Sequence, residues 1–376
     1  FGGVKLQSEG AQAGFPNIPS RGHIVTNNTF YNTSQMGIEF WGSIVDSVIS
    51  SNTIELTQFG ISLANKSKNI TVSNNSVRGC SLYGIETADS IGTTIIGNVV
   101  DGTTGNDVPF VYDGIIVNGI SVTPSLANVI GNVVKNCRHA CMMNYSADGS
   151  NIIGNTFIQS GGNINFYNQA SSHINFSNNV LTNRTGTYFI MLDADRNNLV
   201  NTSGITIANN DFNGSVTDWG ILYYNGGHTG TNTQVLIENN RTYNVQYCGY
   251  GMINVSDYPP LYALHRNNFG PSGAGYSISD YQIPGGSSPY GNTNIENGIQ
   301  YYGNYTYTIP PTTGITGNGL WMCVWSGGQG VTNNVRVRYK GYADYSNAAT
   351  TTEIFASMVP YQAPGIAHSL AVMPQG

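Results

Sequence analysis

Ten asparagines recur through the first 270 residues, each within a short segment of β-forming residues. They are Asn28, Asn52, Asn75, Asn98, Asn132, Asn155, Asn179, Asn210, Asn240 and Asn268, separated by 24, 23, 23, 34, 23, 24, 31, 30 and 28 residues. A period in the low twenties is too short for a propeller blade, and the alternating β-branched residues show no helical periodicity. The repeat therefore predicts a solenoid with one strand-rich coil per asparagine.

Stacked coils place equivalent residues about 4.8 Å apart, so each asparagine amide can donate to one neighbour and accept from the other. We therefore expect the ten asparagines to lie along one corner as a hydrogen-bonded ladder. Asparagine also tolerates the left-handed backbone conformation of a tight corner, which would explain the choice of this residue. Repeats longer than 24 residues predict loops that leave the coil, around residues 101–113, 183–188, 211–219 and 225–233.

Each coil contains a second strand, which often begins with Gly-Ile, as at residues 37–38 and 84–85. If the isoleucine points inward, strand alternation predicts two outward columns. The first column is Glu39, Ser62, Glu86, Ile116, Met142, Asn165, Met191 and Leu222, and the second is Trp41, Ala64, Ala88, Asn118, Asn144, Tyr167, Asp193 and Tyr224. This face carries the acids and aromatic rings that are typical of sugar-binding surfaces.

The composition agrees with a rigid β protein: 47 of the 376 residues are glycine, 24 are tyrosine, and 9% are charged. The net charge is −6, and the longest basic cluster lies at residues 336–340, so we expect neither nucleic-acid binding nor membrane insertion. The five cysteines are odd in number and lack metal-ligand spacing. They predict structural thiols, with no metal and no cofactor.

The asparagine repeat stops near residue 281, where the chain becomes rich in Gly, Pro and Tyr. We predict a parallel β-helix domain over residues 1–283 and a β-sandwich over residues 284–376. An unpaired end coil invites association, so the second domain would cap it, hold a trimer together or bind a glycan. Since the chain opens at Phe1 without an initiator methionine, we expect a further region before it.

The Asn-centred repeat and the segment Gly37-Ile-Glu-Phe-Trp-Gly42 resemble the pectate-lyase-like right-handed parallel β-helix superfamily. Within it, about residues 20–280 look most like the receptor-binding tailspikes of tailed bacteriophages. The resemblance implies a homotrimer that is made in the bacterial cytoplasm, joins the phage tail through the missing N-terminal region, and acts at the host surface. Such proteins bind and usually cleave a bacterial surface polysaccharide, a capsule or a lipopolysaccharide O-antigen. The calcium-ligand pattern of pectate lyases is absent.

Hydrolysis by an endo-glycosidase is the first functional hypothesis. It requires one carboxylic acid to protonate the leaving oxygen and one carboxylate to activate water or attack directly. The predicted catalytic residues are Asp193 and Asp195, with Glu86 and Asp113 in reserve. The predicted substrate-binding residues are Tyr167, Tyr224, Trp219, Trp41 and Asp218. The competing interpretation of residues 193–197 is an ordinary polar turn.

Two other classes of function remain. A binding-only adhesin would hold the same polysaccharide without an active acid pair. A polysaccharide lyase would need a base and a group that neutralises a uronate, for which the sequence offers Tyr112 or His139 with Arg138.

Overall fold

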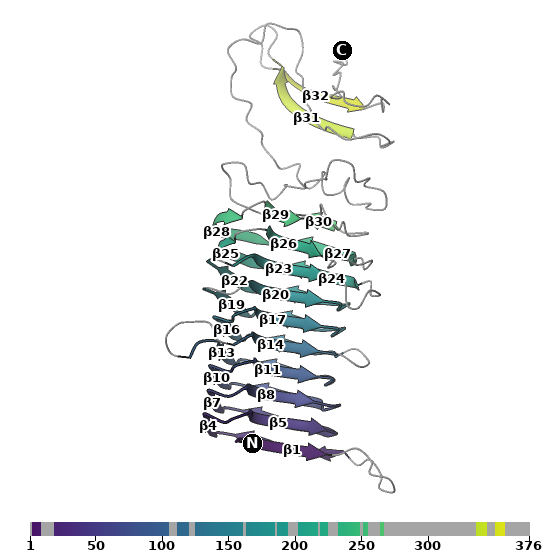
Figure 1. The fold of residues 1–376 in the computed structure, drawn as a ribbon. Coiled ribbons are helices and arrows are strands. Elements are labelled where there is room, and N and C mark those ends of the chain that lie inside the picture. Colours follow the sequence, from purple (N-terminus) through teal and green to yellow (C-terminus); the bar gives the residue numbers. More distant parts are fainter. Residues whose placement is uncertain are drawn as a thin grey trace. The chain divides into compact units, whose positions relative to one another are not determined.

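The computed structural model describes residues 2–8, 19–104, 111–119, 125–160, 163–184, 186–194, 202–216, 219–224, 232–248, 251–254, 264–266, 336–343 and 350–357. Strands from successive coils stack into three parallel sheets (Figure 1). The chain passes from sheet A to sheet B to sheet C and then returns to sheet A one coil further on. This arrangement confirms the predicted parallel β-helix.

Each sheet consists of strands contributed by successive coils. Sheet A contains β1 (Val4–Ser8), β5 (Met36–Gly42), β8 (Phe59–Ala64), β11 (Tyr83–Ala88), β14 (Asp113–Asn118), β17 (Ala140–Tyr145), β20 (Ile164–Gln169), β23 (Tyr188–Asp193), β26 (Trp219–Tyr224) and β29 (Gly251–Asn254). Sheet B contains β2 (Ser20–Arg21), β6 (Ile44–Ser50), β9 (Lys68–Ser73), β12 (Thr94–Ile96), β15 (Asn128–Ile130), β18 (Asn151–Ile153), β21 (Asn175–Ser177), β24 (Thr202–Ala208), β27 (Asn232–Glu238) and β30 (Leu264–Arg266), and β3 (Ile24–Thr26) also pairs with β6. Sheet C contains β4 (Thr29–Tyr31), β7 (Thr53–Glu55), β10 (Ser76–Arg78), β13 (Val99–Asp101), β16 (Val133–Lys135), β19 (Thr156–Gln159), β22 (Val180–Asn183), β25 (Asp211–Val216) and β28 (Arg241–Cys248).

Beyond the β-helix, the structure describes one antiparallel pair, β31 (Arg336–Ala343) with β32 (Thr350–Ser357). The predicted β-sandwich over residues 284–376 stays a prediction, because most of it lies outside the described residues. Across the described part of the chain, no helix has the length and hydropathy needed to span a membrane.

The asparagine ladder is confirmed from Asn28 to Asn240, whereas Asn268 lies outside the described residues. Asn75 shows the repeating pattern: its Nδ2 donates to Asn98 Oδ1 at 2.9 Å and to the backbone oxygen of Ile49 at 3.0 Å. Its backbone N–H also donates to Asn98 Oδ1, at 2.9 Å. Each ladder amide from Asn52 to Asn240 is buried. The ladder therefore satisfies polar groups in the interior that water cannot reach.

The ladder asparagines do not themselves adopt the left-handed conformation, which corrects the sequence-based interpretation. The residue before each of them does, with positive φ at Asn27, Ser51, Asn74, Gly97, Gly131, Gly154, Asn178, Asn209 and Asn239. The chain turns the corner at this preceding position. The ladder residue can then direct both its backbone N–H and its amide along the stack.

The predicted outward columns hold for most coils and fail for two. Strand pairing aligns Ile115 with Met142 and then with Phe166, so Met142 points inward and its place in the outward column belongs to Met143. Asn165 is also buried, and its Nδ2 donates to backbone oxygens inside the coil. Asn144 is likewise inward. These two coils lack the Gly-Ile pair that marks the start of β5, β8, β11, β14 and β26, and the alignment predicted for them is shifted along the strand.

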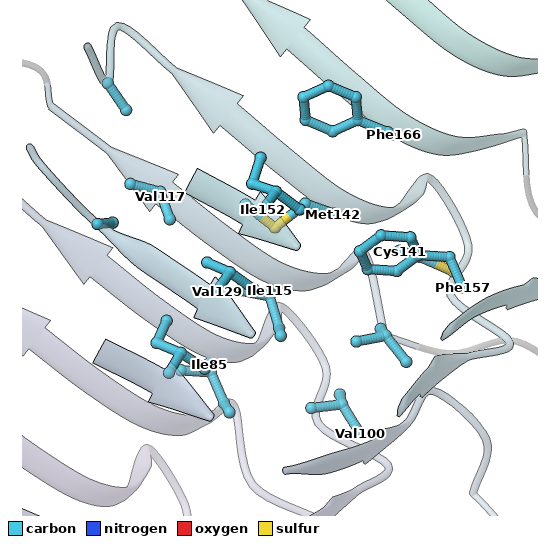
Figure 2. Packing of buried hydrophobic residues seen from close by; sticks show 14 of the residues in the cluster. Ile85, Val100, Ile115, Val117, Val129, Cys141, Met142, Ile152, Phe157 and Phe166 are labelled. Carbon is cyan, nitrogen blue, oxygen red and sulfur yellow. The ribbon is translucent and has the colours of Figure 1, made fainter. Parts of the chain in front are cut away.

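Inward side chains fill the space between the sheets (Figure 2). Phe166 of β20 and Phe176 of β21 stack with ring centroids 4.3 Å apart. The predicted structural thiols are confirmed for Cys80, Cys137 and Cys141, which are free and buried. Burial raises the pKa of Cys80 to about 11, as expected for an unreactive thiol.

The loop predictions need two corrections. Residues 183–188 connect β22 to β23 without extra length, since the same connection in the previous coil runs from 159 to 164. The extra residues of this coil lie between β23 and β24, and the predicted loop at 211–219 contains strand β25.

Candidate functional site

An additional column lies at the start of the sheet A strands, and the sequence analysis missed it. Its members are Met36, Phe59, Tyr83, Asp113, Ala140, Ile164 and Tyr188. It lies three residues before the predicted column that contains Glu39 and Glu86, so strand alternation does not place it in that outward column. Asp113 is linked to the outer face through His139, whose ring meets Tyr167 of the outward column.

Asp113 and His139 form a partly buried pair on neighbouring coils. His139 Nδ1 lies 2.8 Å from Asp113 Oδ1, which also accepts the backbone N–H of Ala140 at 3.0 Å. The Asp113 side chain is 1% exposed and that of His139 is 21% exposed. A carboxylate on Nδ1 fixes the imidazole tautomer and leaves Nε2 as the basic nitrogen.

Aromatic rings hold His139 from two sides. Tyr112 stacks on the imidazole at 4.8 Å with an interplanar angle of 18°, and Tyr167 meets it edge-on at 5.6 Å. The guanidinium of Arg138 lies 5.1 Å from the Tyr112 ring centroid. We name Tyr112, Asp113, Arg138, His139 and Tyr167 the His139 cluster. A base and a cation thus lie beside a partly exposed aromatic face.

Asp193 is buried, and its carboxylate is hydrogen-bonded within the protein. Its Oδ2 accepts the Tyr167 hydroxyl at 2.8 Å and the Gln169 amide at 3.2 Å, and the residue is 3% exposed. Gln169 and Tyr224 are its pairing partners in sheet A. The predicted column of Tyr167, Asp193 and Tyr224 is therefore wrong, because Tyr167 pairs with Met191. The Tyr167 hydroxyl still reaches the Asp193 carboxylate on the neighbouring strand. Burial and then Asp193 raise the pKa of Tyr167, so its hydroxyl stays protonated.

Glu86 is a partly exposed acid near the cluster. Ser62 Oγ donates to its Oε2 at 2.9 Å. Burial raises the pKa of Glu86, and the charge of Glu39 adds to the rise while the Ser62 hydrogen bond opposes it. The pKa of Tyr83, the strand-pairing partner of Asp113, is raised by burial and then by the charges of Asp113 and Glu86. Glu39 itself is buried and pairs with Lys5 at 2.8 Å.

The remaining predicted site residues lie either away from the His139 cluster or outside the described residues. Trp41 is 37% exposed on β5, three strands along sheet A from β14, and carries Lys5 5.4 Å from its ring centroid. Asp195 and Asp218 lie outside the described residues, as does the side chain of Trp219. Within the described ranges, no three His, Cys, Asp or Glu side chains come together to hold a metal.

Comparison with known proteins places the fold. Residues 4–157 match the family model described as right handed beta helix region, and no curated protein matches the chain in sequence. The crystal structure of the periplasmic alginate epimerase AlgG is 13% identical, with a TM-score of 0.50, covering 64% of this chain and 57% of the epimerase. PfbA, a surface adhesin of Streptococcus pneumoniae, is 10% identical (TM-score 0.49; 71% of this chain, 78% of the adhesin). The catalytic unit of a GH87 alpha-1,3-glucanase from Streptomyces thermodiastaticus is 9% identical (TM-score 0.41; 69% and 66%).

These identities are low, and the chain spans little more than half the length of the alginate epimerase. The likeness to the alginate epimerase therefore shows a common fold, and activity has to be argued from the site. The stacked parallel sheets from β1 to β30, together with the family match over residues 4–157, show that this part of the chain folds as a right-handed parallel β-helix.

Proposed function

We propose that the outer face of sheet A binds an acidic bacterial surface polysaccharide and cleaves it by elimination at the His139 cluster. The observation that carries the proposal is the imidazole of His139, held on Nδ1 by the buried Asp113 carboxylate. This arrangement is typical of a general base. Asp113 and Asp193 are both buried, and Asp193 also accepts two side-chain hydrogen bonds, so neither carboxylate is placed to act on a sugar directly.

Each member of the cluster has a part in the reaction. His139 Nε2 removes the proton on the carbon beside the uronate carboxylate. The bond from the adjacent ring carbon to the glycosidic oxygen then breaks, a carbon–carbon double bond forms, and the departing oxygen takes a proton from water. Arg138 neutralises the uronate carboxylate, which favours loss of that proton. Tyr112 offers its exposed ring edge to the sugar.

Variants of the pair test this proposal on purified capsule or O-antigen and on the soluble polyuronates alginate and polygalacturonate. His139→Gln is expected to lower the cleavage rate by about a hundredfold or more. Asp113→Asn should lower it similarly, because an amide no longer fixes the tautomer. His23→Gln, on the sheet B side, is the matched control and should retain the rate. Full activity in both cluster variants would refute the role of this pair.

Hydrolysis is the second candidate, favoured by the raised pKa of Glu86. A carboxyl whose pKa is raised keeps its proton to higher pH and can protonate a leaving oxygen. Of the two sequence-based partners of Glu86, Asp193 is buried and hydrogen-bonded, and Asp195 lies outside the described residues. Hydrolytic products carry one added water and no new double bond, whereas elimination products absorb in the ultraviolet. Binding without any product would instead support an adhesin.

We also propose, on the sequence resemblance, that the chain is part of a phage tailspike and forms a homotrimer. In the single chain, Ile116 and Leu222 of the outward column are only 3% and 7% exposed, and Met142 points inward. These residues leave little apolar surface for a partner subunit to cover. The trimer proposal therefore rests on the resemblance.

A further inference from the structure

Two asparagines lie side by side in the interior, away from the ladder. Asn144 of β17 and Asn168 of β20 are pairing partners on neighbouring coils, and both are fully buried. The residues before and after them in the same column are Val117 and Leu192. Figure 2 shows Val117 with Met142, Ile152 and Phe166 in this part of the core. Two amides thus occupy an otherwise apolar stretch.

Their hydrogen-bonding capacity is largely unused by the protein. Neither Nδ2 nor Oδ1 of Asn144 has a partner among the protein atoms, and neither has Oδ1 of Asn168. Only Asn168 Nδ2 is bonded, to the backbone oxygen of Ser171 at 3.1 Å. The ladder amides are saturated by comparison. Since buried polar side chains are nearly always hydrogen-bonded, these three atoms point to a bound group between them.

We infer that this pair of amides is a binding site for ordered water inside the β-helix. One water that accepts from Asn144 Nδ2 and donates to both amide oxygens makes about three hydrogen bonds, the usual number for a buried water. A divalent cation fits poorly, because the two amide oxygens provide no negative charge. A water at this site would link β17 to β20, which the Asn144 and Asn168 side chains do not do by a direct hydrogen bond.

The water site lies on the inner side of the strands that carry the outer face. Asn168 stands between Tyr167 and Gln169, and both of these donate to Asp193. Asn144 stands between Met143 and Tyr145. Ordered water behind these positions would fix the inward amides, and with them the register of the outward side chains. This inference does not depend on the proposed reaction.

A crystal structure of the whole chain, at a resolution that shows ordered water, tests the site directly. We expect a density peak at about 3 Å from Asn144 Nδ2 or Oδ1 and from Asn168 Oδ1. Amides that bond to each other, or a site without a peak, would overturn the inference.

Oxygen-17 relaxation provides a second test in solution, because it reports long-lived internal water. Asn144→Leu should reduce this signal by the contribution of at least one molecule. The matched control is Met142→Leu, on the same strand, which should leave the signal unchanged. An equal signal in both variants would contradict the site. If Asn144→Leu does not fold, the wild-type crystal structure decides.

Discussion

At the scale of single residues, Asn155 shows how one side chain joins neighbouring coils. Its Nδ2 donates to Asn179 Oδ1 and to the backbone oxygen of Val129, and its Oδ1 accepts from Asn132. Asn155→Leu should lower the free energy of unfolding by roughly 1–3 kcal/mol for each buried group left unpaired. Thermal melting measures the loss. Asn151→Leu is the control, since it removes only one partly exposed bond; equal melting of both variants would contradict the ladder's role.

Glu86 makes a pH-dependent contribution to stability. Its folded pKa is raised above the ordinary value of 4.5, mainly by burial, so the native state holds this proton more tightly than the unfolded state. The stabilisation is complete below the unfolded pKa and is lost as the pH rises through the folded pKa. Glu86→Gln should flatten this part of the curve of unfolding free energy against pH. Ser62→Ala should move the loss of stability to higher pH, because the hydrogen bond that lowers the Glu86 pKa is gone. An unchanged curve in both variants would contradict the role of Glu86.

At the scale of elements, the bond from Tyr167 to Asp193 ties β20 to β23 on the outer face. Tyr167→Phe keeps the ring and removes the hydroxyl, leaving the buried carboxylate with one donor fewer. We expect a loss of about 1–3 kcal/mol in unfolding free energy, measured by denaturant titration. Tyr31→Phe, at a tyrosine that is 65% exposed, is the matched control. Equal stability of the two variants would show that the bond contributes nothing.

The sequence predicts these elements well where a local signal exists. The asparagine spacing locates nine rungs, and Gly-Ile marks the start of several sheet A strands. The register fails at β17 and β20, where Cys141-Met142 and Asn165-Phe166 replace Gly-Ile. Asp113 and His139 were both candidates, but under different hypotheses. Their contact depends on a register that passes through the longest, 34-residue repeat, which the sequence alone cannot align.

At the scale of the whole molecule, the homotrimer is the prediction that most needs a direct measurement. Light scattering on the purified chain should report a mass of three times 40.3 kDa, independent of concentration over a wide range. A single species of 40.3 kDa would contradict the trimer. That result would not affect the His139 cluster, since all five of its members come from one chain.

The nature of the cleavage products tests the central claim most directly. The intact protein is incubated with capsule and lipopolysaccharide from candidate host bacteria, and the products are followed by ultraviolet absorbance and mass spectrometry. Elimination at the His139 cluster predicts oligosaccharides that absorb in the ultraviolet and are each lighter by one water than the hydrolytic product. His139→Gln should form them at a rate lower by about a hundredfold or more. Saturated products of hydrolytic mass, formed equally by wild type and His139→Gln, would contradict it.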